Sequence, residues 1–455
     1  MEDLSWKETR PGRWERPQSC LEKINLLNRN VKKALDRDNW AKTAVAKLEF
    51  NPSLGDPASA LKVAWKQVRY NYPEIAAFPY NGIYMYRIGN PEQVSLWVSA
   101  TFSVVEHTSV DELLGHIPRN EQMMCYYLPN TSEILIRSPH YRLDARGAIF
   151  CLNNLIQSLA DLYPVLIFGG CANNLSPSID DALDIPSKPT PEIEAAVTKR
   201  LAASKSHKPA LELTPTITSA LPGVTKRCFI SLSKGETQSV IASCASAAMD
   251  LPTALHAALV NAVTKIAPPS EAKSFMASFH SDLRFLITKD VTTKQAPTSC
   301  TSVITSEIDV SPSTNFKSYY SQLAPVYAAG YAPYLKSTGI FHERLAKSMD
   351  GKGGVDVEAD GQLQPRFASL GVIDEMLTKD VGAGVVRVKG FWIGTETLTM
   401  RMMVHTWIWE DQMVFSVCYN ESFWDDALVQ RLLDAIRDTV LVELALGGLM
   451  KGVAL

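Results

Sequence analysis

The sequence predicts an α/β fold of two lobes, each a mixed sheet with flanking helices, and three observations support this prediction. The chain has 455 residues, more than one domain usually holds. Segments typical of strands and of amphipathic helices occur in both halves. Between the halves, a stretch rich in Pro and Ser is typical of a connection. We therefore expect an N-terminal lobe at 1–185, a linker or crossover at 186–222 and a C-terminal lobe at 223–455, with a crevice between the lobes.

The elements of the first half follow from hydrophobic periodicity and composition. Strands are expected where β-branched and aromatic residues are frequent, at 80–87, 94–105, 123–128 and 133–138. Helices are expected at 20–36, 58–68, 108–117 and 145–159. The last of these is the clearest, because Ile149, Leu152 and Ile156 fall on one apolar face at helical spacing.

The second half repeats this mixture of strands and helices. An amphipathic segment near 191–203 lies within the connection. Strands are expected at 224–232, 282–288, 368–373, 385–392, 397–409 and 413–419. Helices are expected at 235–249 and 252–266, over most of 316–349 and at 424–443, with a Gly-rich loop at 352–364.

Composition excludes several classes of function. Charged residues make up 20% of the chain and hydrophobic residues 46%, which is typical of a globular protein. The net charge of −3 does not indicate a nucleic-acid partner, which usually needs a concentrated basic face. The N-terminus lacks an apolar signal, and the apolar stretches are shorter than the roughly 20 residues of a membrane span. We therefore expect a cytoplasmic protein with no membrane partner.

The eight cysteines are scattered, without a CxxC pair or an adjacent cluster of Cys and His. A zinc site is therefore not expected, and in a chain with no secretion signal the cysteines are expected to be reduced thiols.

One spacing suited to proton-transfer chemistry, H-x-x-x-D, occurs twice. The copy from His107 to Asp111 is followed by the Ser109-x-x-Glu112 pattern that opens helices. A carboxylate in the first turn of that helix is favoured by the helix dipole, so an ordinary helix start explains this copy.

The copy from His140 to Asp144 lies between a predicted strand and a predicted helix. An imidazole at such a loop suits a general base for an alcohol or amine, and the Asp could turn inward to an Arg. An ordinary loop His followed by a helix-capping Asp fits the local sequence equally well.

A family resemblance favours the catalytic interpretation of His140. The segment Ser138-Pro-His-Tyr-Arg-Leu-Asp-Ala-Arg-Gly147 resembles the HHxxxDG signature of the chloramphenicol-acetyltransferase-like superfamily, which includes condensation domains. Features near both ends resemble its fungal branch of trichothecene 15-O-acetyltransferase-like enzymes: Gly12-Arg-Trp-Glu-Arg-Pro17, Ser369-Leu-Gly-Val-Ile-Asp374 and Tyr419-Asn-Glu-Ser-Phe423. The resemblance spans nearly the whole chain.

The resemblance implies a fold and a chemistry. Two chloramphenicol-acetyltransferase-like lobes would enclose a tunnel, with acetyl-CoA entering as cosubstrate from one face and an alcohol acceptor, such as a fungal terpenoid or polyketide, from the other. His140 would be the general base of a direct, sequential transfer. Asp144 would be structural and pair with an Arg of the second lobe, for which Arg284 is the candidate. Ser369 could point into the tunnel and stabilise the oxyanion.

The resemblance implies no bound cofactor or metal and identifies no CoA-contacting residue, and we expect a monomer. Two departures leave a second function open: Pro139 replaces the first His of the signature, and Ala145 replaces its Gly. The same scaffold could instead catalyse cyclisation, dehydration or C–C bond formation with His140 as a proton shuttle. A third interpretation is a non-catalytic binding protein, which the presence of both His140 and Asp144 disfavours.

Overall fold

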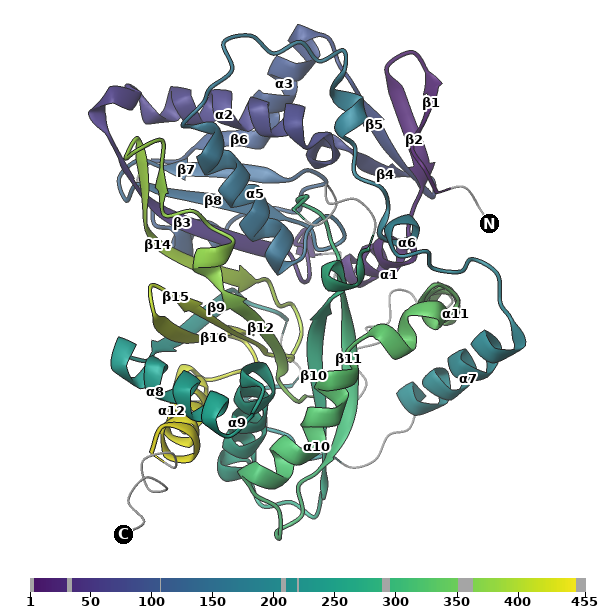
Figure 1. The fold of residues 1–455 in the computed structure, drawn as a ribbon, viewed down its shortest axis with the longest axis vertical. Coiled ribbons are helices and arrows are strands. Elements are labelled where there is room, and N and C mark those ends of the chain that lie inside the picture. The colour runs from purple at the N-terminus through teal and green to yellow at the C-terminus, as the bar shows by residue number, and fades with distance from the viewer. Residues whose placement is uncertain are drawn as a thin grey trace.

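The computed structural model describes residues 4–30, 35–106, 108–205, 210–218, 221–288, 295–350 and 363–446. The predicted α/β architecture of two lobes is confirmed: Figure 1 shows one mixed sheet with its helices above a second one. His107 lies outside the described residues, as does most of the predicted loop at 352–364.

The upper lobe is built on a six-stranded sheet with the order β13-β14-β3-β8-β7-β6. Its strands are β3 (Lys42–Phe50), β6 (Phe102–Val104), β7 (Met124–Leu128), β8 (Glu133–Ser138), β13 (Asp380–Val381) and β14 (Val386–Thr395). Helices α2 (Pro57–Asn71) and α5 (Ala145–Ser158) pack on this sheet and share its apolar core. Strands β13 and β14 fall within the predicted second lobe, but β14 pairs with β3 of the first lobe and β13 pairs with β14. The chain therefore crosses from the lower lobe into the upper sheet and back, so the lobes are not two consecutive segments.

The lower lobe is built on a six-stranded sheet with the order β11-β10-β12-β15-β16-β9. Its strands are β9 (Thr225–Ser231), β10 (Ser274–Asp282), β11 (Thr301–Asp309), β12 (Arg366–Val372), β15 (Met403–Trp409) and β16 (Gln412–Asn420). One face of this sheet carries the helices α8 (Lys234–Ser246), α9 (Leu251–Ile266), α10 (Phe316–Ala329) and α12 (Asp426–Val440) (Figure 1). The opposite face is turned toward the upper lobe.

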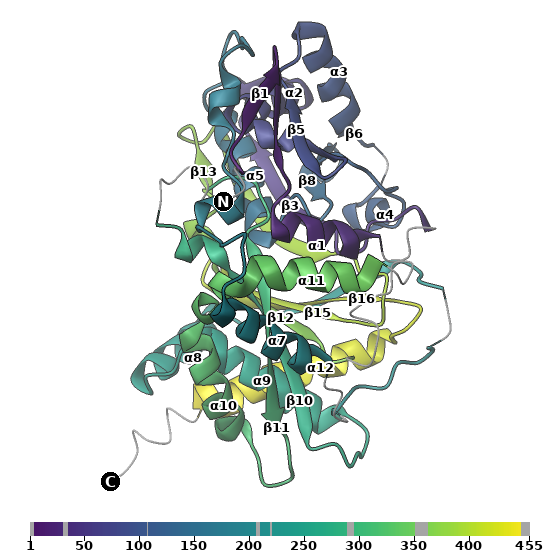
Figure 2. The ribbon, with the colours of Figure 1, turned by 90° about the vertical axis from the view of Figure 1, so that its right-hand side faces the viewer.

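Several shorter elements complete the fold. A four-stranded sheet has the order β1-β2-β5-β4, with β1 (Lys7–Arg10), β2 (Arg13–Pro17), β4 (Phe78–Tyr80) and β5 (Ile83–Arg87). Figure 2 shows α1 (Cys20–Arg29) alongside α11 (Thr338–Asp350) at the level where the lobes meet. The remaining helices are α3 (Pro91–Thr101), α4 (Val110–Leu114), α6 (Ile179–Ala182) and α7 (Pro191–Lys205).

One predicted strand is wrong, and its local sequence explains why. Residues 94–101 belong to helix α3, and only the short β6 follows it. Asn90 caps this helix in a capping box with Gln93, and Pro91 occupies the first turn. The capping box satisfies backbone donors that the start of a helix leaves open, and Pro91 has no N–H that would need a partner. These features outweigh the β-branched composition of the segment.

Several strands were missed or misplaced, including β1 and β2, where no strand is predicted from the sequence. The sequence analysis assigned no element to β3, the central strand of the upper lobe, although Lys47, Leu48, Glu49 and Phe50 alternate polar and apolar side chains. The strand expected at 282–288 ends at Asp282, where β10 gives way to a 3₁₀ turn (Leu283–Leu286), and its neighbour β11 was not predicted.

Candidate active site

His140 lies in the loop between β8 and α5, at the meeting of the two lobes. Its side chain is about 9% exposed, and its Nδ1 is 3.0 Å from the carbonyl oxygen of Leu143. A carbonyl oxygen only accepts hydrogen bonds, so the neutral imidazole carries its hydrogen on Nδ1. Nε2 is then the nitrogen that can take up a proton, as a general base requires.

Asp144 begins α5 and is turned away from His140 into a hydrogen-bonded cluster. Its Oδ1 accepts from the backbone N–H of Gly147 at 2.7 Å, and its Oδ2 accepts from the backbone N–H of Cys300 at 2.6 Å. Arg284 donates to both carboxylate oxygens, at 2.8 and 3.1 Å. Asp144 is therefore at once a helix cap and the link between the loop of His140 and the other lobe.

Arg284, which the resemblance gives as the candidate partner of Asp144, forms this ion pair. It lies in the 3₁₀ turn after β10 and not in the strand expected at 282–288. It also donates to the carbonyl of Thr298 at 2.8 Å and to Asp282 at 3.1 Å. Burial alone would raise the pKa of Asp144, but the guanidinium and the two amides outweigh it and hold that pKa below its ordinary value. Asp144 is therefore a carboxylate near neutral pH and does not exchange protons with His140.

Gly147 permits the close approach of the two lobes beside this cluster. A Cβ atom at this position would lie 2.3 Å from the carbonyl oxygen of Thr298, which no side chain can tolerate. The segment of Thr298 and Cys300 therefore packs directly on the backbone of α5. The family signature has its Gly directly after the Asp, but in this chain Gly147 has this packing role.

A cavity with an empty volume of about 420 Å³ lies in front of His140 and is lined by both lobes. The upper lobe contributes Lys42, His140, Asp144, Ala145 and Arg146, and the lower lobe His280, Asp282, Thr301, Ala368, Ser369, Leu370, Met403 and His405. We call this the reaction cavity. The tunnel that the resemblance implies remains a prediction beyond this cavity.

Strand alternation brings two further histidines to the reaction cavity. Ala368 of β12 is in register with His405 of β15, and His280 lies next to Phe279, which pairs with Phe367 of β12. Phe279 and Phe367 face the helix-covered core, so His280, Ala368 and His405 share the opposite face. The sequence analysis did not identify either histidine, although His405 lies in an alternating strand whose period predicts such a face.

Both of these imidazoles stay neutral. Burial, followed by the nearby Lys42, Arg366 and His140, lowers the pKa of His280 well below its ordinary value. Burial, followed by Lys42 and Arg227, lowers the pKa of His405 to about 3. The polar wall of the reaction cavity is therefore able to donate or accept hydrogen bonds without gaining charge.

Ser369 also lines the reaction cavity, where the register of β12 against β15 is interrupted after this residue.

Cys151 is fully buried against Met123 in the upper core, and burial raises the pKa of its thiol, so it is not a reactive thiolate. Ser233 and Glu236 form the capping box of α8, which accounts for the polar start of that helix. No metal-binding group of three or more Cys, His, Asp or Glu occurs among the described residues.

Comparison with known proteins agrees with this geometry. No family model matches the chain. The structure of TRI3 trichothecene 15-O-acetyltransferase from Fusarium sporotrichioides superposes with a TM-score of 0.82, covering 97% of this chain and 98% of that one at 17% identity. The condensation domain of the Monacolin K polyketide synthase MokA superposes with a TM-score of 0.65 over 96% of this chain and 98% of that one, at 10% identity. These likenesses establish the fold.

Two curated relatives extend the similarity to the sequence. Acetyltransferase pigO of Monascus ruber is 27% identical over 97% of this chain and 99% of its own length. O-acetyltransferase pigM of the same organism is 25% identical over 97% and 88% of the two chains. The chain is an acyltransferase with the fold of the chloramphenicol-acetyltransferase-like superfamily.

A further relative of this acyltransferase carries a different name. The loline biosynthesis cluster 1 transcription factor lolU1 of Epichloe uncinata is 23% identical over 97% of both chains. In the part of the acyltransferase that the structure describes, no helix has the length and apolar character of a membrane span.

Proposed function

We propose that this acyltransferase moves an acetyl group from acetyl-CoA to a hydroxyl of a fungal secondary metabolite, with His140 as the general base. The observation that carries the proposal is the orientation of His140. The carbonyl of Leu143 lies 3.0 Å from its Nδ1, which assigns the ring hydrogen to Nδ1 and makes Nε2 the basic nitrogen, in a cavity lined by both lobes. The acetyltransferase names of two relatives that match over most of their length support the acetyl group, and the name of pigM, an O-acetyltransferase, supports a hydroxyl acceptor.

The transfer proceeds in one sequential reaction. Nε2 of His140 takes the proton of the acceptor hydroxyl while the hydroxyl oxygen attacks the thioester carbonyl. The tetrahedral intermediate then collapses, the C–S bond breaks, and the imidazolium returns the proton to the CoA sulfur. The products are an acetate ester and free CoA, and no covalent bond to the enzyme forms.

Two groups assist this reaction without taking part in proton transfer. Ser369 lines the reaction cavity, and its hydroxyl is the proposed donor to the oxyanion of the intermediate. Asp144 and Arg284 hold the loop of His140 against the lower lobe. The departures Pro139 and Ala145 leave both of these features in place, because neither residue supplies a side-chain hydrogen bond to the cluster.

Thiol release and protein labelling test the proposal together. Purified protein is incubated with radiolabelled acetyl-CoA, with and without a panel of hydroxylated terpenoids and polyketides. We expect CoA thiol release and labelled ester only with an acceptor, and no label on the denatured protein. Stoichiometric labelling of the protein would show a covalent route. Absence of CoA binding by calorimetry would instead favour proton transfer within a single substrate, the second function that the sequence leaves open.

A further inference from the structure

A second, small cavity lies on the other side of the loop that carries His140. Its lining is mostly polar and buried, and comes from seven parts of the chain: Arg16, Ser19, Glu22, Glu74, Tyr84, Met123, Tyr141, Arg142, Ser176, Pro177, Ser178, Ile179, Pro297, Thr298, Ser299 and Cys300. We call it the Arg142 cavity. None of these residues lines the reaction cavity.

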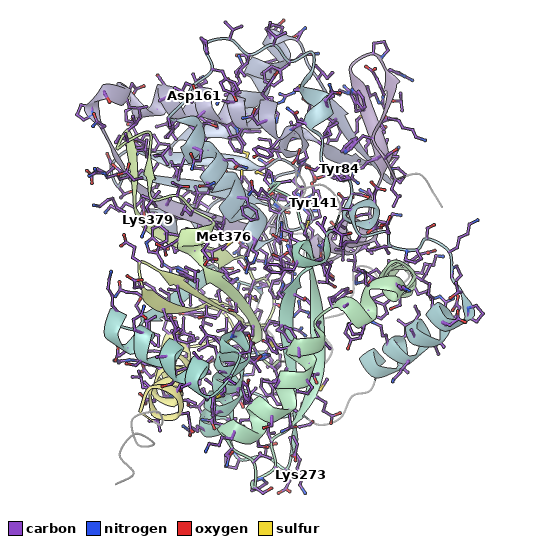
Figure 3. All side chains as sticks on the ribbon, in the orientation of Figure 1. Tyr84, Tyr141, Asp161, Lys273, Met376 and Lys379 are labelled. Atoms are coloured by element: carbon purple, nitrogen blue, oxygen red, sulfur yellow. The ribbon has the colours of Figure 1, made fainter. Side chains whose placement is uncertain are left out.

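The catalytic loop separates the two cavities. His140 lines the reaction cavity, and the next two residues, Tyr141 and Arg142, line the Arg142 cavity. The bond from the Cys300 amide to Asp144 joins the loop to the lower lobe at the same wall. In Figure 3, Tyr141 lies near Tyr84 of β5, and both rings line the Arg142 cavity. A molecule in this cavity would therefore touch the loop that positions His140.

Arg142 is a buried cation without a carboxylate partner among the described residues. It is 4% exposed, and its donors Nε and Nη1 reach the backbone carbonyls of Glu121, at 2.7 Å, and Ile75, at 3.3 Å. Its Nη2 is buried and has no hydrogen-bond partner in the part of the chain that the structure describes. A buried guanidinium left in this state is costly unless another group neutralises it.

The other charged groups of the cavity do not neutralise Arg142. The guanidinium of Arg16 is already paired with Glu22, at 2.6 and 2.8 Å, and only its Nε lacks a partner. Glu74 is 7% exposed, accepts from Ser176 through Oε1 at 3.0 Å, and has no partner at Oε2. Outside the cavity, the carboxylate of Glu121 attracts Arg142 but is already paired with Arg29. The cavity lining therefore contains a buried guanidinium nitrogen and a carboxyl oxygen that lack hydrogen-bond partners among the described residues.

We propose that the Arg142 cavity is a second ligand site, which takes a small monocarboxylate. One oxygen of the ligand accepts from Nη2 of Arg142, and the Nε of Arg16 is the second donor. The protonated carboxyl of Glu74 donates from Oε2 to the remaining acceptor position. This arrangement satisfies the three buried polar atoms that lack partners and leaves no net charge in the cavity.

The pH dependence of binding follows from Glu74. Burial raises the pKa of its carboxyl to about 7. Below that pH the protonated carboxyl donates to the ligand, and above it the carboxylate repels the ligand, so affinity falls as the pH rises through about 7. The titratable and charged groups that surround Glu74 are Arg16, Glu22, Tyr72, Tyr84, Tyr141, Arg142, Cys151 and Cys300. The pKa values of Tyr72, Tyr84, Tyr141, Cys151 and Cys300 are raised, so these groups stay neutral in this range.

Calorimetric titration of the full-length protein with sodium acetate, propionate or butyrate tests the site, with chloride at equal ionic strength as reference. We expect saturable binding with a Kd below about 1 mM at pH 6 and weaker binding at pH 8. Arg142→Met should weaken it about tenfold or more, because a charge-assisted hydrogen bond is lost. Arg69→Met is the matched control: Arg69 is also 4% exposed with unpartnered donors, but it packs on Trp97 outside the cavity. This variant should bind like the wild type.

A second variant protects the test against a misfolded Arg142→Met protein. Glu74→Gln keeps the size of the side chain and its donor, and we expect its affinity to be the same at pH 6 and pH 8. No saturable binding to the wild type would show that the cavity holds water only and overturn the proposal. Binding that His140→Ala abolishes, or that CoA displaces, would assign the acid to the reaction cavity and also overturn it. Neither result depends on whether acetyl transfer is the reaction catalysed.

Discussion

The reaction cavity and the Arg142 cavity lie on the two sides of one loop but differ in whether their charged groups are paired. In the reaction cavity, both lining carboxylates form ion pairs: Asp144 pairs with Arg284, and Asp282 pairs with Arg146 at 3.2 Å. Its imidazoles His280 and His405 are neutral. In the Arg142 cavity, a guanidinium and a carboxyl retain atoms without partners. The first arrangement fixes a base in place, and the second leaves charge to be matched by something that binds.

The difference arises from a change of direction within two residues. His140 faces the lower sheet, whereas Arg142 faces the small sheet and the segment at 176–179. Asp144 then anchors the end of the loop to Cys300 and Arg284. Because one anchored loop forms a wall of both cavities, substitutions in it can separate catalysis from binding of the acid.

The largest expected effect comes from His140→Ala. General-base assistance contributes about 10²–10⁴ in rate, so turnover should fall by that factor while the melting temperature changes little. Steady-state kinetics with a saturating acceptor measures the loss. Acid binding in the Arg142 cavity should persist, which would separate the two sites. The exposed His116→Ala is the control, and equal losses in both variants would remove the special role of His140.

Asp144→Asn should cost about 3–5 kcal/mol of unfolding free energy, because it leaves the buried Arg284 without its counter-charge. Denaturant unfolding measures this cost, and activity should fall with it because the loop loses its anchor. Asp426→Asn breaks an exposed pair with Lys226 and should cost less than about 1 kcal/mol. Unchanged stability with a shifted pH–rate profile would mean that Asp144 tunes His140 directly.

Ser369→Ala should lower kcat by about 10², the loss expected for one donor to an oxyanion. The effect should appear in kcat with KM unchanged, because the hydrogen bond forms only as charge develops on the carbonyl oxygen. Single-turnover kinetics separates this step from product release. A KM effect alone would make Ser369 a substrate contact instead.

The smallest effect concerns the pH dependence of stability. Glu74 of the Arg142 cavity and His405 of the reaction cavity change the free energy of unfolding in opposite directions as the pH rises. The pKa of Glu74 is raised to about 7 in the folded protein. Its contribution to the free energy of unfolding is therefore present below its unfolded pKa of about 4.3 and is lost as the pH rises toward 7. The lowered pKa of His405 gives a contribution that is present above about 6.5 and is lost toward pH 3.

Glu74→Gln should therefore be more stable than the wild type at pH 8, by about 1–3 kcal/mol, and should differ less at pH 4. Denaturant unfolding at both pH values measures this difference. A difference of the same size at pH 4 and pH 8 would mean that ionisation of Glu74 is not its cause.

Local signals predicted much of the fold and part of the site. Helix α5 follows from its apolar face, and Asp144 at its start is the kind of residue that caps helices. The error at 94–105 has a local cause too, since the Asn90 cap and Pro91 were overlooked. Strand β3 was missed because its small and charged residues weaken the usual composition signal, although its alternation is present.

The sequence by itself determined the loop of His140, the helix after it and the residue types that proton transfer needs, because these depend on neighbours within a few positions. Only the tertiary structure decided that β14 crosses to the upper sheet, that His280 and His405 face His140, and that Arg142 faces a separate cavity. These features depend on which segments pack on each side of a strand or loop. Such contacts join residues more than a hundred positions apart, as Asp144 and Arg284 are, and no local pattern encodes them.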